Sequence, residues 1–166
     1  MISILKNRAG LAALLMFAGT ALAVELQPFD ATSLDTIRAA HAGRPFVLAF
    51  WSVYCEPCRK EMGLWKALRN QYPEVPVVLV ATDPPGDRDA VMKFLARHSP
   101  GRVDTWAFAD DYSERVRYAV DRSWRGELPR TYFFDASHRS LARSGVPERR
   151  WIDNWLSQQA PATRTR

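Results

Sequence analysis

Residues 46–62 read FVLAFWSVYCEPCRKEM, and this stretch decides the fold of the 166-residue chain. Its first six residues are an uninterrupted apolar run, which predicts a strand covered on both faces in the middle of an α/β sheet. Pro57 suits the first turn of a helix, so we expect a helix to begin near it. Cys55 and Cys58 therefore lie where a buried strand gives way to a helix.

The predicted helix continues with one apolar face. Its apolar residues are spaced by four, three, three and four positions, which is typical of a helical face turned towards a core. Gly63 interrupts this helix, and we expect a bend there. The residues of the apolar face are Cys58, Met62, Trp65, Leu68 and Tyr72.

The rest of the chain alternates between predicted strands and helices. This alternation predicts an α/β fold with a mixed, partly parallel central sheet of about four to five strands and helices on both faces. The last two strands are close enough in sequence to form an antiparallel hairpin. Predicted strands are 24–29, 75–81, 130–135 and 141–145, with a short insertion at 106–108; predicted helices are 33–41 with Ser33 as N-cap, 91–98, 113–120 and 148–159.

The first 23 residues have the pattern of a signal peptide. Lys6 and Arg8 precede an apolar run at 9–18, and Ala21-Leu22-Ala23 matches the small-x-small site of signal peptidases. The alternative is a retained anchor, but the run is shorter than the roughly 20 residues that span a bilayer. We therefore expect cleavage after Ala23, export to the periplasm, one domain at 24–160 and a flexible tail at 161–166.

The charge of the chain excludes one class of partner. Its formal net charge is +5, and cleavage removes Lys6 and Arg8 without any acid, which leaves +3. The basic residues are scattered, whereas a nucleic-acid-binding face needs a concentrated basic stripe. We therefore expect no nucleic-acid partner, and we expect a monomer.

The two cysteines are separated by only two residues. In an oxidising compartment such a pair usually forms a disulfide. A bridge that closes so short a loop constrains little of the unfolded chain, so a purely structural disulfide is the weaker alternative. A zinc site is weaker still, because it needs four ligands and the remaining candidates are distant in sequence. Those candidates are His41, His98 and His138, and we expect no metal and no small cofactor.

The position of the pair assigns a role to each cysteine. At a helix N-terminus, unpaired N–H groups and the helix dipole stabilise a thiolate at Cys55, and the thiolate is the attacking species in disulfide exchange. Cys58 follows almost one turn later and can resolve a mixed disulfide. Glu56 places a carboxylate beside Cys55 that would oppose the thiolate. The alternative for Glu56 is a solvated charge with little influence.

The residues FWSVYCEPCRKEM resemble the thioredoxin superfamily, in particular the exported TlpA-like thioredoxins that include cytochrome c maturation reductases. The resemblance covers about 29–159 and implies a thioredoxin-like fold with Cys55 and Cys58 as the redox-active pair. It also implies an acid near the thiols at Glu61, which would shuttle the proton of Cys58. The alternative for Glu61 is an ordinary exposed helix residue.

A second part of the resemblance lies at 127–131, ELPRT, just before the strand TYFFD. It implies that Pro129 is the family's cis-proline, that its loop faces the dithiol, and that Leu128 pairs its backbone with a substrate strand. Trp124 either lines a substrate groove or anchors the core. Arg130 either brings a cation near the active site or points to water.

Four positions depart from the family pattern, and two of them are Gly63, where many relatives have a helix-bending proline, and Arg130, where a small polar residue is common. Tyr54 replaces the usual Trp before the first cysteine, and the resemblance implies that it contacts substrate. Ala49 occupies the position of thioredoxin's buried acid, which shifts interest to Glu61.

These observations predict an enzyme, a periplasmic dithiol reductase. Its partners would be a protein disulfide, either apocytochrome c or a dedicated partner, and a membrane thiol electron donor. The alternatives are an oxidase or isomerase on the same fold, or a thioredoxin-fold binding module or chaperone without catalysis. The direction of exchange depends on a reduction potential, which the sequence leaves open.

Overall fold

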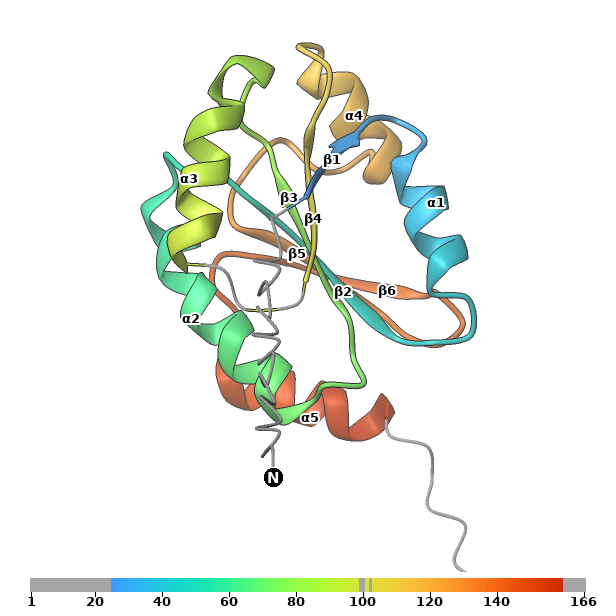
Figure 1. Cartoon of the computed structure of the whole chain (residues 1–166). Helices are drawn as coiled ribbons and strands as arrows, with labels where there is room; N and C mark the ends of the chain where they lie inside the picture. Colours follow the sequence, from blue (N-terminus) through green and yellow to red (C-terminus); the bar gives the residue numbers. More distant parts are fainter. Residues whose placement is uncertain (1–24, 99–100, 102, 160–166) are drawn as a thin grey trace, which may run out of the picture.

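The computed structural model describes residues 25–98, 101 and 103–159; the predicted signal peptide and tail lie outside these residues. Strands and helices alternate along the chain, as the sequence predicts (Figure 1). The strands are β1 (Leu26–Phe29), β2 (Phe46–Trp51), β3 (Val77–Ala81), β4 (Asp104–Phe108), β5 (Arg130–Phe134) and β6 (Ser140–Ser144). The helices are α1 (Ser33–Ala40), α2 (Glu56–Gln71), α3 (Arg88–His98), α4 (Ser113–Val120) and α5 (Arg149–Gln159), with a 3₁₀ turn at Pro85–Asp87.

The described part of the chain forms one six-stranded sheet in the order β1-β4-β3-β2-β5-β6, one strand more than the upper end of the predicted range. Strands β1 to β4 pair in parallel, and β5 and β6 are antiparallel to their neighbours. The extra strand is β4, the predicted short insertion, which pairs with both β1 and β3. Short strands carry a weak local signal because their pairing partners are distant in sequence.

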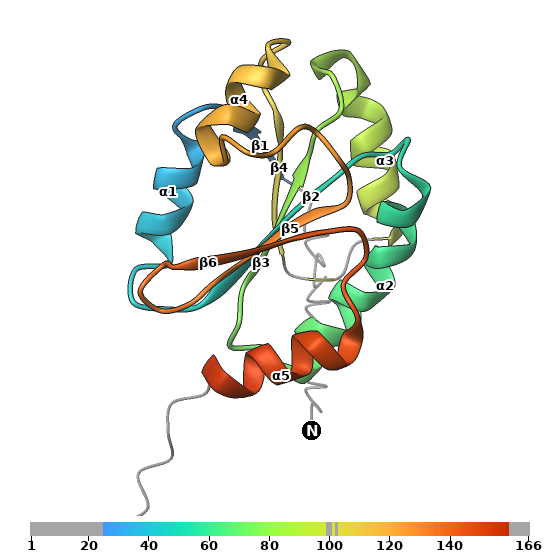
Figure 2. The same ribbon diagram turned by 180° about the vertical axis from the view of Figure 1, so that it is seen from behind.

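Helices cover both faces of the sheet and divide the core in two. Figure 1 and Figure 2 show α1 and α4 on one side and α2 and α3 on the other. One apolar cluster packs residues of α2, α3 and α5 against the sheet, including Trp51 and Cys58. The other packs α1 and α4 against the opposite face, including Phe50 and Trp124. Consecutive residues of β2 thus point into different clusters, because strand side chains alternate between faces.

Two local predictions need correction or completion. The N-cap of α1 is Thr32 and not Ser33, and no side chain caps this helix. The reason is a turn before it, in which the Asp30 carboxylate accepts from Thr32 N–H at 2.7 Å and the Asp30 N–H donates to Ser33 Oγ at 2.9 Å. Helix α2 runs unbroken through Gly63. No helix of the described residues has the length and apolar character needed to cross a membrane.

Candidate active site

The two cysteines form a disulfide at the start of α2. Cys55 is the N-cap of the helix, and the Cys58 N–H donates to Cys55 Sγ at 3.2 Å. Cys55 is half-buried, whereas Cys58 is 0% exposed within the cluster that packs α2 on the sheet. One sulfur therefore lies near the surface, and the other lies behind it in the core.

A buried aspartate, which the sequence analysis did not single out, holds the segment before Cys55. Asp83 is 3% exposed and follows β3, next to the end of β2. Its Oδ1 accepts from Ser52 Oγ at 2.7 Å and from Val53 N–H at 3.1 Å. Ser52 Oγ in turn accepts from Tyr54 N–H at 3.1 Å. Burial raises the pKa of Asp83, and the hydrogen bonds from Ser52 and Val53 oppose that rise.

The sequence offered one signal for Asp83. It is an acidic residue directly after a buried parallel strand, at the carboxyl edge of the sheet where ligand and catalytic residues gather in open α/β sheets. Its partners at 52 and 53, however, are about thirty residues away in sequence, so only the folded chain reveals them.

Two exposed residues flank the dithiol. Tyr54 is 73% exposed beside Cys55, and its pKa is raised chiefly by the nearby negative charge of Asp87. Glu56 is also exposed, and its carboxylate pairs with Lys60 at 2.8 Å. The hydrogen bond and the charge of Lys60 lower the pKa of Glu56. Its charge is thus both solvated and partly balanced, which favours the interpretation of Glu56 as a solvated charge with little influence.

Glu61 lies in the core rather than on the surface. It is 1% exposed, and it is three residues after Cys58 on the same face of α2, so the two side chains are neighbours. Neither carboxylate oxygen has a hydrogen-bond partner among the described residues. Burial raises the pKa of Glu61 to about 8. The alternative of an ordinary exposed helix glutamate is therefore wrong.

Segment 121–129, which we call the proline loop, comes next to the end of β2 because β5, which follows it, pairs with β2. The Leu128–Pro129 peptide bond is cis. Antiparallel pairing sets Arg130 opposite Phe50, so the residue before β5 comes next to the end of β2. In Figure 1 the segment between α4 and β5 runs beside the one that joins β2 to α2. Leu128 is partly buried, and within the described part of the chain its backbone takes part in no hydrogen bond.

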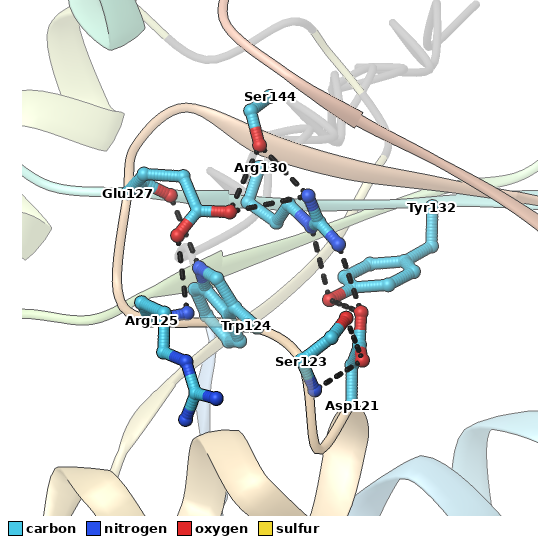
Figure 3. Close-up of polar contacts among 8 residues, drawn as sticks. All are labelled: Asp121, Ser123, Trp124, Arg125, Glu127, Arg130, Tyr132 and Ser144. Atoms are coloured by element: carbon cyan, nitrogen blue, oxygen red, sulfur yellow. Dashed lines mark hydrogen bonds and ion pairs between the residues drawn. The ribbon is translucent and has the colours of Figure 1, made fainter.

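The structure decides between the two interpretations of Trp124 and departs from both interpretations of Arg130. Trp124 is 4% exposed, packs on Phe50 with ring centroids 4.6 Å apart, and donates from Nε1 to the Glu127 carbonyl at 3.1 Å. It is a core anchor and lines no open substrate groove. The Arg130 side chain is 12% exposed and points neither to water nor to the thiols; it is engaged by neighbouring polar groups (Figure 3).

Comparison with known structures identifies the fold. A secreted Mycobacterium tuberculosis disulfide oxidoreductase homologous to E. coli DsbE matches with a TM-score of 0.57 at 20% identity, covering 72% of this chain and 85% of that one. A thiol:disulfide interchange protein from Chlorobium tepidum TLS matches with a TM-score of 0.60 at 16% identity, covering 74% and 83%. The chain has a thioredoxin-like fold.

Sequence comparison gives a relative of the same kind. The thioredoxin-like chain is 23% identical over 127 residues to thiol-disulfide oxidoreductase ResA of Bacillus cereus. The match covers 72% of this chain, which spans 65% of the length of that relative. No family model matches the chain.

The thioredoxin-like fold brings most of the predicted site residues together. Cys55, Cys58 and Glu61 lie at the cap and on the first two turns of α2, and β2–β5 pairing sets Pro129 next to the end of β2, the strand that leads into this helix. The described residues contain no group of three His, Cys, Asp or Glu side chains placed to hold a metal ion.

Proposed function

We propose that this protein is an exported thiol–disulfide oxidoreductase that works as a dithiol reductase through Cys55 and Cys58. One observation carries the proposal: a disulfide at the N-terminus of α2 joins a half-buried sulfur to a fully buried one. Such a pair gives an accessible nucleophile and a shielded resolving thiol. The dithiol needs no small cofactor for this chemistry.

In the reduced protein, the Cys55 thiolate attacks one sulfur of a substrate disulfide. A mixed disulfide forms, the substrate S–S bond breaks, and the departing substrate thiolate takes up a proton. Unpaired N–H groups at the start of α2 and the helix dipole stabilise the attacking thiolate. Two electrons thus pass from the dithiol to the substrate once the second step is complete.

The second step involves Cys58 and Glu61. The Cys58 thiol gives its proton to the Glu61 carboxylate and attacks Cys55 Sγ, which re-forms the Cys55–Cys58 disulfide and releases the reduced substrate. A carboxyl group with a pKa of about 8 lies close enough to neutral pH both to accept that proton and to return it. An ordinary carboxylate, with a pKa near 4.5, would be a much weaker base.

The proposed export determines which kind of electron donor a reductase would need. The periplasm is oxidising, so a reductase there needs electrons from a membrane thiol donor. We expect a protein disulfide as substrate, with apocytochrome c or a dedicated partner as candidates. Leu128 would pair its unengaged backbone with an extended substrate segment, next to Tyr54 at the surface. Secretion of the Mycobacterium tuberculosis neighbour supports the exported location.

Insulin reduction with a dithiol donor tests the activity. We expect turnover by the wild type and none by Cys55→Ser, while Cys58→Ser should accumulate a mixed disulfide that is visible by mass spectrometry. Turnover that survives Cys55→Ser would rule out the dithiol mechanism. No turnover by the wild type, together with suppression of aggregation, would favour a chaperone.

A glutathione redox titration tests the direction. A potential well below about −200 mV, as in thioredoxin, supports a reductase, and a potential near that of the strong oxidant DsbA, about −120 mV, favours an oxidase.

A further inference from the structure

The guanidinium of Arg130 lies at the centre of a polar cluster behind the proline loop (Figure 3). Its three nitrogens donate to four side chains. Nη2 donates to Asp121 Oδ2 at 2.8 Å, and Nε donates to Tyr132 Oη at 3.1 Å. Nη1 donates to Ser144 Oγ at 2.7 Å and to Glu127 Oε1 at 3.2 Å. The planar fork of an arginine suits this set of acceptors, whereas a lysine has fewer donors and no fork.

The cluster joins the proline loop to the end of α4 and to the β5–β6 hairpin. Asp121 is the C-cap of α4, where the loop begins, and Ser144 is the last residue of β6. Glu127 belongs to the loop itself, two residues before Pro129. A single side chain thus ties the start and the end of the 121–129 segment to the β5–β6 hairpin.

Further hydrogen bonds of Glu127 fix the backbone beside Leu128. Its Oε1 also accepts from Ser144 Oγ at 3.0 Å, and its Oε2 accepts from the Arg125 N–H at 3.1 Å. Its carbonyl accepts from Trp124 Nε1. Both the side chain and the backbone of the residue before Leu128 are therefore fixed.

Both acids of the cluster stay ionised at neutral pH. Burial alone would raise the pKa of Asp121, but hydrogen bonds from Ser123, Arg130 and Tyr132 lower it to about 2. The pKa of Glu127 is lowered by its hydrogen bonds and by the charge of Arg130, against a contribution from burial. Removing the guanidinium would leave both carboxylates without the counter-charge that lies between them.

The guanidinium acts from the opposite face of the sheet to the thiols. Arg130 is in register with Phe50, whose cluster contains Trp124 and Tyr132, whereas Trp51 and Cys58 belong to the other cluster. A change at Arg130 can therefore move the loop without directly contacting either sulfur.

We propose that Arg130 is a positioning residue: through Asp121, Glu127 and Ser144 it holds the backbone of Leu128 in place to receive an extended, disulfide-bearing peptide. This inference rests on the proposed function. It predicts that replacing Arg130 weakens the binding of substrates that pair with the loop. The reduction of disulfides too small to reach the loop should not change.

The test compares a protein disulfide with a small one. Arg130→Met keeps the apolar stem but removes all donors. We expect KM for insulin to rise about five- to tenfold with little change in kcat, because an unfixed loop must be ordered on binding. The reduction potential, and the second-order rate with a small aromatic disulfide such as dithiobis(nitrobenzoate), should stay at wild-type values. Arg130→Lys should recover part of the loss, since it keeps the charge.

Two further variants keep the test decisive. Arg139→Met removes an exposed arginine that pairs with Asp135 at the far end of the same hairpin, and it should match the wild type. Ser144→Ala removes one exposed partner of Arg130 and should raise KM for insulin slightly without endangering the fold. If Arg130→Met fails to fold, Ser144→Ala and Arg130→Lys carry the test.

Two results would overturn the inference. One is an unchanged KM for insulin in the folded Arg130 and Ser144 variants, and the other is an equal loss with the small disulfide, which would indicate general damage. Wild-type protein that reduces neither substrate would instead contradict the proposed function, so the two failures are distinguishable.

Discussion

Two buried acids flank the dithiol, and their surroundings differ. Asp83 holds the segment before Cys55 and accepts hydrogen bonds from Ser52 and Val53. Glu61 lies after Cys58 and has no hydrogen-bond partner among the residues that the structure describes. Burial raises both pKa values. Hydrogen bonds from Ser52 and Val53 oppose the rise at Asp83, whereas at Glu61 only the side chain of Trp65 opposes it. A satisfied buried acid fixes a conformation, whereas an unsatisfied one is suited to hold and release a proton.

The largest expected effect is the pH dependence that Glu61 gives to the free energy of unfolding. Glu61 has a folded-state pKa of about 8 against 4.5 when unfolded, so between these values the native state holds a proton that the unfolded state does not. The contribution of Glu61 to the free energy of unfolding of the oxidised protein is therefore fully present below pH 4.5 and falls by about 4 kcal/mol as the pH rises to 8. Glu61→Gln should remove this fall, as measured by urea denaturation across pH. A slope that persists in Glu61→Gln would show that Glu61 is not the buried proton carrier.

Asp83 should matter chiefly for stability. Asp83→Ala leaves the Ser52 hydroxyl and the Val53 N–H buried without their acceptor, so we expect the free energy of unfolding to fall by about 3 kcal/mol at neutral pH. Asp83→Asn, which keeps one acceptor oxygen, should lose less. Asp89→Ala removes an exposed carboxylate nearby in sequence and serves as the control. Urea denaturation measures all three, and an Asp83→Ala variant as stable as this control would contradict the anchoring role.

Glu61→Gln should also slow one step of catalysis and leave the other unchanged. Removing a general base typically costs about a hundredfold or more, so Glu61→Gln should slow release of the mixed disulfide by roughly that factor near neutral pH. Attack by Cys55 on the substrate should change little, because it precedes the step that needs the proton acceptor. Rapid-mixing experiments that follow the mixed disulfide by acid quenching and mass spectrometry resolve the two steps. Slowing of attack alone would assign Glu61 to the first thiol instead.

Predictions from the sequence succeeded where the signal is local. The apolar run of β2, the cysteine spacing and the face of α2 are each encoded within a few neighbouring residues, and the structure has β2 at the predicted bounds. The pairing of β1 with β4 was predicted only in part, because it joins segments almost eighty residues apart.

The side-chain clusters were missed for the same reason. Arg130 has two acceptors within three residues of it in sequence, Glu127 and Tyr132, yet its contacts with Asp121 and Ser144 arise only when α4 and β6 converge. Ser52 and Asp83 likewise meet only through the pairing of β2 with β3. Residue types indicated which groups can donate or accept, but not which of them the fold brings together.

The smallest effect concerns a third acid, Glu56, which is next to Cys55 but exposed. Solvent screens its charge, and Lys60 pairs with it at 2.8 Å. Glu56→Gln should therefore leave the rate of attack on a small disulfide within about twofold of the wild type at physiological salt. Lys60→Met, which frees the carboxylate, should shift the rate slightly in the opposite direction. A tenfold acceleration in Glu56→Gln would mean that this charge reaches the thiolate unscreened, and burial would then no longer distinguish the acids that act on the dithiol from those that do not.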